Sequence, residues 1–338
     1  MAKERKISGR ATKPFRVVLP ASSANLGPAF DAAAIALNLY LKVTARPHSH
    51  FVLSAAGRDP EICGKQQDHL LLATYSTILQ QEHKPVLPLS LRLENEIPVG
   101  KGCGSSAAAR LAGIALAVHF GKLSWNTVRI VTEASRLEHH PDNAAACWLG
   151  GLAVARVAED GAVQWASHKP KGDWPLLLVV PPQGLPTEKA RRVLPAQYSR
   201  GNAVINIQNS MLLLSAFVQG RPELLAGALQ DRLHQPYRAA LCPLLTTMKK
   251  LAGTPGILGT VLSGAGPSVL VFLEPGSALN RVRKRVEKHL QQEGLSAELI
   301  AARVSMRAGC AGLEPKLRSR ARAAKFGNAF VRSAIPLV

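Results

Sequence analysis

Aromatic residues and long apolar runs are both scarce in this chain of 338 residues. Phe, Trp and Tyr make up 5% of it, although 47% of the residues are hydrophobic. That balance excludes a disordered chain and is typical of an Ala- and Leu-rich α/β or α+β enzyme. No apolar stretch reaches the roughly 18 residues that a membrane helix needs, and the N-terminus leads into the strand-like FRVVLP rather than a signal-peptide core. We therefore expect a cytoplasmic protein.

The sequence also has no closely spaced pair of cysteines and relatively few acidic residues. The five cysteines form no CxxC pair and have no His at metal-ligand spacing, which argues against structural zinc and fits a reduced compartment. Lys and Arg number 42 against 22 Asp and Glu, a net charge of +20 that favours phosphate-bearing ligands. Much of the excess lies at the two ends of the chain. No aromatic ladder or nucleic-acid module accompanies it, so a nucleic-acid partner is not expected.

The length of the chain exceeds what one hydrophobic core usually serves, so we expect two domains. The stretch 160–175, with its Gly, Pro and Lys residues, is the best candidate linker. The predicted division is a basic N-terminal tail 1–14, an N-terminal domain 15–165, a C-terminal domain 172–311 and a basic C-terminal tail 312–338.

Hydrophobic periodicity and turn residues predict the secondary structure. In the first half we expect strands at 15–20, 39–46, 51–54, 89–95 and 152–157, and helices at 68–83 with Asp68 as cap, 105–120, 124–138 and from 142. In the second half we expect strands at 176–181, 257–263, 268–273 and 295–304, and helices at 203–219, 222–231, 240–251 and 278–292. The pattern indicates an α+β fold in which a sheet backed by helices precedes a small α/β sandwich.

The stretch PVGKGCGSSAAAR at 98–110 joins a strand to a helix through three glycines and two serines. Glycines let backbone N–H groups converge on an anion, and the start of a helix adds its positive dipole. Ser105 and Ser106 offer hydroxyls to phosphate or Mg²⁺, and Lys101 offers a neutralising charge. It is not a Walker loop, because GKS/T at the required spacing is absent. Taken alone, the stretch fits a purely structural turn equally well.

Two stretches offer groups for a charged substrate. In PASSANLGPAFD at 20–31, Asn25 and Asp31 are candidate acceptors for an ammonium group; the alternative is a polar hairpin loop with an exposed Asp31. In LPTEKARRVLP, Thr187 and Arg191 lie four apart on one face of a helical turn, and DRLHQPYR supplies Arg238. Arginine's planar fork suits a carboxylate, although isolated arginines in so basic a chain are more often surface residues.

The stretch EHHPDNAA at 138–145 concentrates polar residues between two helices. Glu138 suits Mg²⁺, which prefers carboxylate and phosphate oxygens, whereas no third ligand at recognisable spacing supports zinc. His140, Asp142 and Asn143 are candidates to line an alcohol pocket, with Asp142 as a helix cap as the structural alternative. LSGAGPS at 262–268 is a second glycine turn, where Gly264 permits close approach of backbone to a ligand.

These four stretches, in this order, resemble the GHMP kinase superfamily, and in detail its homoserine kinase family, over about residues 15 to 305. PASSANLGPAFD is similar to the family's first motif, GKGCGSSAAA to its phosphate loop, EHHPDN to its EGHPDN signature and SGAGPS to its C-terminal glycine loop. Relatives that act on mevalonate, galactose or isoprenoid precursors share the phosphate loop but not the SSANLGP…FD and HPDN patterns. The chain departs from the usual motifs at Ala29, His69 and His139.

The resemblance implies an ATP-dependent kinase that phosphorylates the side-chain hydroxyl of L-homoserine with Mg²⁺, a step of threonine biosynthesis. It also implies an N-terminal ATP-binding α+β domain with helices over its sheet, and a C-terminal ferredoxin-like α/β sandwich. By the same resemblance, the substrate contacts Asn25, Asp31, Thr187, Arg191, Arg238 and Gly264, and the reacting end contacts His140, Asp142 and Asn143. ATP contacts Asp68, Pro98, Gly100, Lys101, Gly102, Cys103, Gly104, Ser105 and Ser106, and Mg²⁺ contacts Ser106 and Glu138, with Glu133 as a fallback.

The mechanism implied is in-line attack of the hydroxyl on the γ-phosphate, governed by positioning and charge neutralisation. Some relatives have an aspartate base where this chain has Asn143, so we expect the proton to pass to the phosphate itself. One alternative is another GHMP-type kinase with a different alcohol substrate. A remote alternative is a non-catalytic basic RNA-binding protein, which leaves Asn25, Asp31 and Glu138 without a purpose. The oligomeric state is open, with a homodimer among the alternatives.

Overall fold

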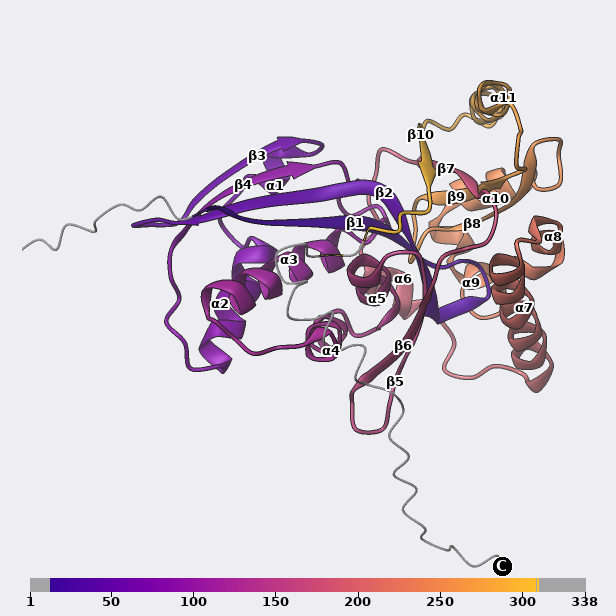
Figure 1. Cartoon of the computed structure of the whole chain (residues 1–338). Helices are drawn as coiled ribbons and strands as arrows, with labels where there is room; N and C mark the ends of the chain where they lie inside the picture. The colour runs from indigo at the N-terminus through magenta and orange to yellow at the C-terminus, as the bar shows by residue number, and fades with distance from the viewer. Residues whose placement is uncertain (1–12, 308, 310–338) are drawn as a thin grey trace, which may run out of the picture.

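The computed structural model describes residues 13–307 and 309, which form two β-sheets with helices packed against both (Figure 1). Among these residues, the larger sheet has six strands in the order β3-β4-β2-β5-β6, with β1 paired to β2, and the smaller sheet has the order β10-β7-β9-β8. The strands are β1 Phe15–Asn25, β2 Ala29–Pro47, β3 Val52–Gly57, β4 Leu89–Asn95, β5 Leu152–Val157, β6 Val163–His168, β7 Pro175–Val180, β8 Ile257–Leu262, β9 Val269–Leu273 and β10 Glu298–Arg303. The predicted α+β class is confirmed.

The helices carry most of the remaining chain. The α-helices are α1 Pro60–Cys63, α2 Leu70–Gln81, α3 Ser105–Phe120, α4 Thr127–Glu138, α5 Asp142–Leu149, α6 Thr187–Arg192, α7 Arg200–Gln219, α8 Leu225–Ala228, α9 Gln235–Arg238, α10 Pro243–Lys249 and α11 Leu279–Gln292, and the short 3-10 helices are η1 Pro222–Leu224 and η2 Ala239–Leu241. Among the described residues, no helix combines the length and the apolar character that crossing a bilayer requires.

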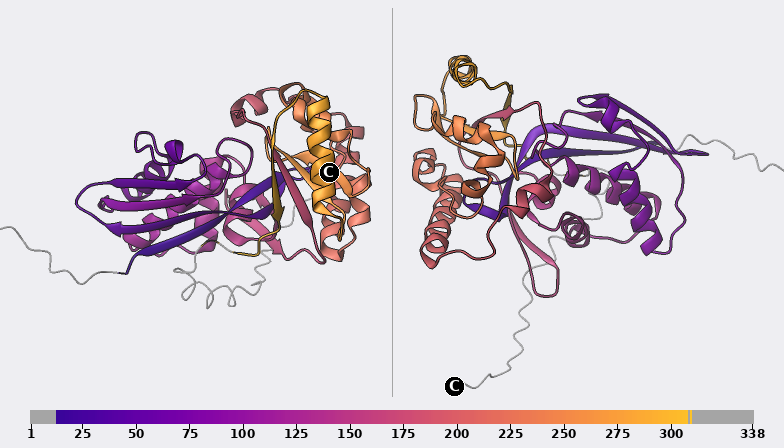
Figure 2. Two further views of the ribbon diagram at one scale, coloured as in Figure 1. Left: turned by 90° about the horizontal axis from the view of Figure 1, so that it is seen from above. Right: turned by 180° about the vertical axis from the view of Figure 1, so that it is seen from behind.

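Alternation along the strands explains why the larger sheet buries one face. Phe15 and Val17 are buried, while Arg16 between them is exposed. The buried side packs against α3 and α5, and α2 and α4 complete the same layer (Figures 1 and 2). Helix α3 spans the predicted residues and packs tightly against α2, where a Cβ on Gly113 would lie 2.5 Å from the Leu71 carbonyl oxygen. This packing holds the start of α3 at the site described below.

The smaller sheet is covered on both faces, which explains why β7 is a continuous apolar run. Leu176, Leu178 and Val180 face the core shared with α7 and α8, whereas Leu177 and Val179 face α10 and α11. All its strand pairs are antiparallel. In the order of the chain, its strands lie as fourth, first, third and second, which is the ferredoxin-like arrangement expected for this half.

The two sheets share one core and are joined by the chain after β10. One continuous hydrophobic core contains residues of both sheets, among them Leu37 of β2 and Phe272 of β9. After β10 the chain returns to the larger sheet, where the Ser305 N–H donates to the Ala36 carbonyl at 2.8 Å. The boundary between the two sheets is therefore filled with packed side chains. The proposed tails 1–14 and 312–338 lie outside the described residues, apart from residues 13 and 14, and the domain division stays a prediction.

Three expectations about the larger sheet and its helices were wrong. The motif 20–31 is not a loop, because β1 runs to Asn25 and β2 begins at Ala29, so only a three-residue turn separates them. The stretch 160–175 is not a free linker, because β6 within it pairs with β5 across a tight turn at Gly161 (φ 80°). Helix α2 has His69 rather than Asp68 at its N-cap, with no side-chain cap.

Two predicted helices of the second half are shorter than expected. The helix 222–231 is a 3-10 turn followed by the four residues of α8. The helix 240–251 is interrupted at Cys242, and α10 begins at Pro243, because proline fits the first turn of a helix but not its interior. Between them lies α9, a single turn, and His234 directly before it contacts the Gly27 carbonyl of the first motif at 2.8 Å.

Candidate functional site

The four motifs meet in one cavity of about 180 Å³ that residues from both halves of the chain line. Most residues predicted for the site line it, namely Asn25, Asp31, Gly100, Gly102, Gly104, Ser105, Ser106, Glu138, His140, Asp142, Asn143, Thr187, Arg191, Arg238 and Gly264. Leu185, Pro186 and Ala265 also line it, although no sequence pattern pointed to them. The cavity therefore brings together groups that lie more than 200 residues apart in the chain.

One wall of the cavity is the loop between β4 and α3. Gly100, Gly102 and Gly104 all have positive φ, at 68°, 76° and 71°. A Cβ on Gly102 would lie 2.3 Å from the Ser263 carbonyl oxygen, so only glycine fits there. Gly104 is the N-cap of α3 and offers no side-chain cap, and the first turn holds no acidic residue. Its backbone N–H groups and the helix dipole therefore form an anion site.

The C-terminal glycine turn braces that loop. The Ser263 hydroxyl donates to the Gly102 carbonyl at 2.7 Å. The Asn25 amide nitrogen donates to the Gly264 carbonyl at 2.8 Å, and its Oδ1 accepts from the Asp31 N–H at 3.0 Å. Asn25 therefore ties the first motif to the last and keeps one lone pair of Oδ1 for a ligand.

Three predicted loop residues do not line the cavity. Pro98 is buried in the short segment that connects β4 to the loop. The Lys101 Nζ donates to the carbonyl of Pro182. The Cys103 side chain is buried, and burial raises the pKa of its thiol to about 12, so it stays protonated. These residues shape the loop, and a direct contact of their side chains with nucleotide stays a prediction.

Two further predicted residues lie away from the cavity. Asp68 is exposed before α2 and does not line it. Glu133 is held on its own helix by Arg136, with N–O distances of 3.1 and 2.6 Å. Because Glu133 lies one and a half turns before Glu138 on α4, it projects from another side of that helix. The fallback role of Glu133 as a metal ligand is therefore not supported.

A carboxylate and a hydroxyl face each other beside the phosphate loop. The Ser106 hydroxyl donates to Glu138 Oε2 at 2.7 Å, and Arg110 Nε donates to Oε1 at 2.6 Å. The Glu138 side chain is only 7% exposed, so its carboxylate interacts with these two partners and with the cavity rather than with bulk water. Oxygen donors next to an anion site are what Mg²⁺ prefers, so these residues fit that ion. Arg110, one turn after Ser106, was not predicted.

No group of three or more His, Cys, Asp or Glu side chains that could hold a metal ion is present among the described residues. Mg²⁺ commonly takes only one or two carboxylates from a protein and completes its shell with water and phosphate oxygens. A structural zinc site, which needs about four protein ligands, is absent from the same part of the chain.

A buried polar chain forms the floor of the cavity. His140 Nδ1 lies 2.7 Å from Asp142 Oδ1, which also accepts from the Asn143 N–H at 2.5 Å. The Ser22 hydroxyl donates to Asn143 Oδ1 at 2.7 Å, which orients the amide. Burial lowers the pKa of His140, but its hydrogen bond to Asp142 and the charge of that group raise it by more, so the pKa lies above its ordinary value. Asp142 is the first residue of α5, and its N-cap is Pro141.

The opposite wall carries paired charges suited to an amino acid. Arg191 of α6 forms a two-pronged contact with Asp31 of β2, at 3.0 and 2.7 Å. Arg238 lies beside it, is 1% exposed, and donates through Nε to the Ala190 carbonyl at 2.9 Å. Burial and the charge of Arg191 lower the pKa of Arg238, which still stays protonated because arginine does not lose its proton in proteins. The wall thus presents one carboxylate and two guanidinium groups.

Two residues that the sequence did not point to hold these arginines. The guanidinium carbons of Arg191 and Arg238 lie 5.6 and 5.4 Å from the centre of the Phe30 ring. His234 stacks on that ring at 5.2 Å, and its Nδ1 lies 3.1 Å from Arg238 Nη1. Because a guanidinium can only donate, His234 Nδ1 is the acceptor and Nε2 carries the proton, which it donates to the Gly27 carbonyl at 2.8 Å.

Asp231 fixes the turn that presents His234. Its carboxylate accepts from the N–H groups of Leu233, His234 and Gln235 at 2.8, 3.0 and 2.5 Å. Burial lowers the pKa of His234 to about 4, so the imidazole is neutral. An Asp often accepts from backbone N–H groups a few residues later and so fixes a turn, and Asp231 in DRLHQPYR was the available signal for this one.

Comparison with known proteins agrees with this geometry. The family model described as the GHMP kinases N terminal domain matches residues 69–151, and the model described as GHMP kinases C terminal matches residues 213–292. A homoserine kinase from Solibacter usitatus is 44% identical over 85% of this chain and 93% of its own length. One from Synechococcus is 38% identical over 85% of this chain and 94% of its own.

Solved structures share the fold. The crystal structure of homoserine kinase from Cytophaga hutchinsonii superposes with a TM-score of 0.76 at 22% identity, covering 89% of this chain and 98% of that one. The mevalonate kinase of Methanococcus jannaschii gives a TM-score of 0.62 at 13% identity, covering 88% and 99%. With relatives above 30% identity along nearly their whole length, the chain belongs to the homoserine kinase family of the GHMP kinases.

Proposed function

We propose that this protein transfers the γ-phosphate of ATP to the side-chain hydroxyl of L-homoserine and releases O-phospho-L-homoserine. One observation carries the proposal: a helix-start anion site and an Asp31–Arg191–Arg238 wall line the same small cavity. The first suits a triphosphate and the second suits the ammonium and carboxylate of an amino acid. The polar floor between them is where the reacting hydroxyl belongs.

The charged wall recognises the two ends of an amino acid. The substrate ammonium binds Asp31 and the free lone pair of Asn25, and its carboxylate binds the forks of Arg191 and Arg238. The Asp31–Arg191 pair is one-third exposed, so its two members can turn from each other to the substrate at modest cost. Phe30 and His234 hold Arg238 in place during that exchange.

The phosphate side provides neutralisation and orientation. The N–H groups around Gly102 and Gly104 bind the phosphates, and Ser106 with Glu138 would hold Mg²⁺. When bound, that ion neutralises the charge on the phosphoryl oxygens. The protein holds the hydroxyl and the γ-phosphate in line, which is the main contribution expected for a loose phosphoryl-transfer transition state.

We infer that no side chain removes the hydroxyl proton. Asn143 lies on the floor of the cavity and its amide cannot accept a full proton. Asp142 Oδ1 is already engaged by His140 and by the Asn143 N–H, and the residue is 1% exposed. The proton then passes to an oxygen of the transferred phosphate.

We also place the protein in the cytoplasm, because its four described cysteines are free thiols, which fits a reducing compartment.

A substrate series tests the proposal with one group removed at a time. Purified protein and Mg-ATP are mixed with L-homoserine, with 3-aminopropan-1-ol, which lacks the carboxylate, or with 4-hydroxybutanoate, which lacks the ammonium. We expect ADP release with L-homoserine and a kcat/KM at least about 100-fold lower for each truncated alcohol, because each loses charge-assisted hydrogen bonds. Faster turnover of either truncated compound would favour another alcohol substrate, and no ATP turnover with any of them would refute the proposal.

A further inference from the structure

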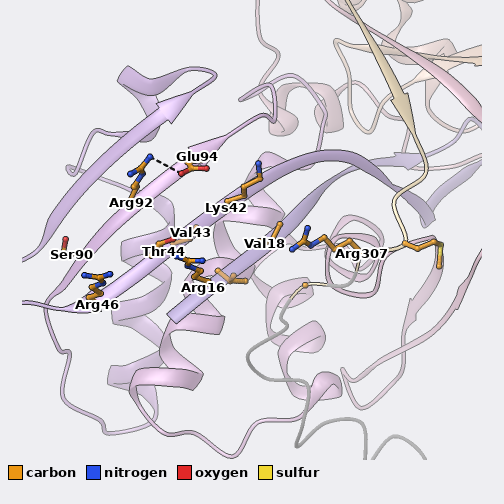
Figure 3. Close-up of a pocket in the computed structure, with 13 residues that line it drawn as sticks. Arg16, Val18, Lys42, Val43, Thr44, Arg46, Ser90, Arg92, Glu94 and Arg307 are labelled. Carbon is orange, nitrogen blue, oxygen red and sulfur yellow. Dashed lines mark ion pairs between the residues drawn. The ribbon is translucent and has the colours of Figure 1, made fainter. Parts of the chain in front are cut away.

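The outer face of the larger sheet, away from the kinase cavity, forms a broad open concavity of about 1110 Å³. Figure 3 shows its side chains standing on β1, β2 and β4, on the side of the sheet away from the helical layer. The cations on it are Arg16 of β1, Lys42 and Arg46 of β2, Arg92 of β4 and Arg307 after β10. We call this surface the basic sheet face.

Strand register places these side chains in rows. Arg16 lies opposite Thr44, and Thr44 lies opposite Arg92, so the three form one row across β1, β2 and β4. Arg46 lies opposite Ser90 in the next row. Adjacent strands are about 4.8 Å apart, so Arg16, Arg92 and Arg46 each have a hydroxyl as a neighbour across the sheet, whereas Lys42 lies opposite Glu94. The residues between them in sequence are buried in the core, and this alternation keeps the cations on the outer face.

Only part of this positive charge is balanced. Lys42 pairs with Glu96 at 2.8 Å, and Arg92 contacts Glu94 at 3.3 Å. Within residues 13–307 and 309, no carboxylate lies within 4.0 Å of the Arg16, Arg46 or Arg307 guanidinium groups. Among the described residues, three cations thus lie on one open face without a carboxylate in ion-pair contact, and Glu94, which also lines the face, is paired with Arg92.

Both basic ends of the sequence join the described chain near this face. The described chain begins at residue 13, three residues before Arg16, and Gly309, which lines the face, directly precedes the C-terminal stretch. Residues 1–12 hold four Lys or Arg against one Glu, and residues 310–338 hold six against one. Like charge excludes these stretches as occupants of the face. It equally excludes a second copy that meets the face with its own.

We propose that the basic sheet face binds the phosphate backbone of a single-stranded nucleic acid. Arginine forks and the hydroxyls of Thr44 and Ser90 are donors that phosphate oxygens accept. The residues that line the face are not aromatic, and the Tyr40 ring beside it lies under the Arg307 guanidinium, 5.8 Å from the ring centre, so the binding that we propose uses phosphate contacts and is independent of sequence. A concave face does not suit a flat membrane, and rows of cations across three strands suit an extended polyanion. The sequence alone argued against a nucleic-acid partner, because the face is assembled from three strands and no single stretch of the chain carries it.

Salt dependence and a matched variant test the proposal. Anisotropy of a labelled 20-nucleotide oligouridine is measured against salt concentration for the full-length protein, for Arg16→Ala/Arg46→Ala/Arg307→Ala, and for a control, Arg281→Ala/Lys284→Ala/Lys288→Ala. The control removes the same charge from exposed positions of α11. Each lost phosphate contact lowers the log–log salt slope by about 0.7. The face variant should therefore lose about two in slope and on the order of 100-fold in affinity at 100 mM salt.

The control variant and the remaining measurements also test the proposal. The control should bind as the wild type does, and both variants should keep the wild-type kinase kcat, because none of these residues lines the kinase cavity. Equal losses in the two triple variants would reduce the effect to net charge and overturn the proposal, as would unchanged binding by the face variant. A poly-glutamate peptide that binds as tightly as the oligonucleotide would overturn it in favour of an acidic protein. The three single variants, each expected to lower the slope by about 0.7, replace the triple variant if it does not fold.

Discussion

The substitution Arg191→Lys tests the two-pronged hydrogen bonding of the arginine side chain separately from its positive charge. Arg191 makes two hydrogen bonds to Asp31, at 3.0 and 2.7 Å, and in the proposed complex the same fork grips the substrate carboxylate. Lysine keeps the positive charge but presents a single ammonium, which cannot make two parallel hydrogen bonds to one carboxylate. The substitution therefore removes about one charge-assisted hydrogen bond and leaves the rest of the wall in place.

The size of the effect follows from the exposure of the pair. A hydrogen bond to a charged group contributes about 1.5–3 kcal/mol. Because the Arg191 side chain is 33% exposed, solvent screening favours the low end, about 1.5–2 kcal/mol. At about 1.4 kcal/mol per factor of ten, the KM for homoserine should rise about 10- to 30-fold. The KM for ATP and kcat should stay within about twofold, because the loss is one of uniform substrate binding.

The assay is initial-rate ADP release with each substrate varied at saturation of the other. Arg192→Lys is the matched control, because Arg192 is the next residue of α6, and its pair with Glu188 is about three-quarters exposed on both sides. It should change neither KM by more than about twofold. A rise in the homoserine KM below about threefold for Arg191→Lys, or a rise in the ATP KM instead, would refute the placement of the carboxylate on this wall.

Three further predictions concern other parts of the site. Glu138→Gln should lower kcat/KM on the order of 100-fold and raise the Mg²⁺ concentration needed for half-maximal rate, whereas Glu133→Gln, on the same helix but outside the cavity, should stay within about twofold; equal effects would contradict the assignment. Gly102→Ala should cost more unfolding free energy in urea, by about 1–3 kcal/mol, than Gly100→Ala, because both have positive φ but only the first meets backbone oxygens within 2.6 Å; equal costs would mean that strain alone matters. His234 has a folded pKa of about 4, below its ordinary value, so its contribution to stability is complete above about pH 6.5 and is lost as pH falls toward 4. Urea unfolding at pH 7 and pH 5 should therefore show a larger acid loss for the wild type than for His234→Gln, and identical losses would exclude a buried neutral imidazole.

The neutral His234 also bears on how the site is organised. Its Nε2–H bond to the Gly27 carbonyl and its contact with Arg238 join the turn of the first motif to α9. Phe30, in the same first motif, stacks with His234 and lies under Arg238. The substrate arginines are thus supported by the strand turn that also presents Asp31, so the ammonium and carboxylate subsites are built as one unit.

Local sequence was sufficient for the elements whose stability is local. Helix α3 begins and ends as predicted, because a glycine turn precedes an unbroken Ala- and Leu-rich stretch and Gly121 follows it. The short helix that carries Thr187 and Arg191 also forms at the expected place. Where the local sequence preference and hydrogen bonding between strands disagreed, the strand pairing determined the structure. The Ser- and Asn-rich first motif is a strand because β2 supplies its backbone partners. Strand β6 forms within the expected linker because β5 lies beside it.

Four ordered motifs were enough to identify the family and most of the residues that line the cavity. Which of those groups contact one another became known only from the folded chain, because the partners lie far apart in the sequence. Asp31 and Arg191 are 160 residues apart, and Asn25 and Gly264 are 239 apart. The structure removed Glu133 from the site and added Arg110, Phe30 and His234. It also gathered on one sheet face three arginines that have no carboxylate partner within the described part of the chain. Side-chain chemistry can be read from single residues, whereas distance, burial and charge balance exist only after the chain has folded.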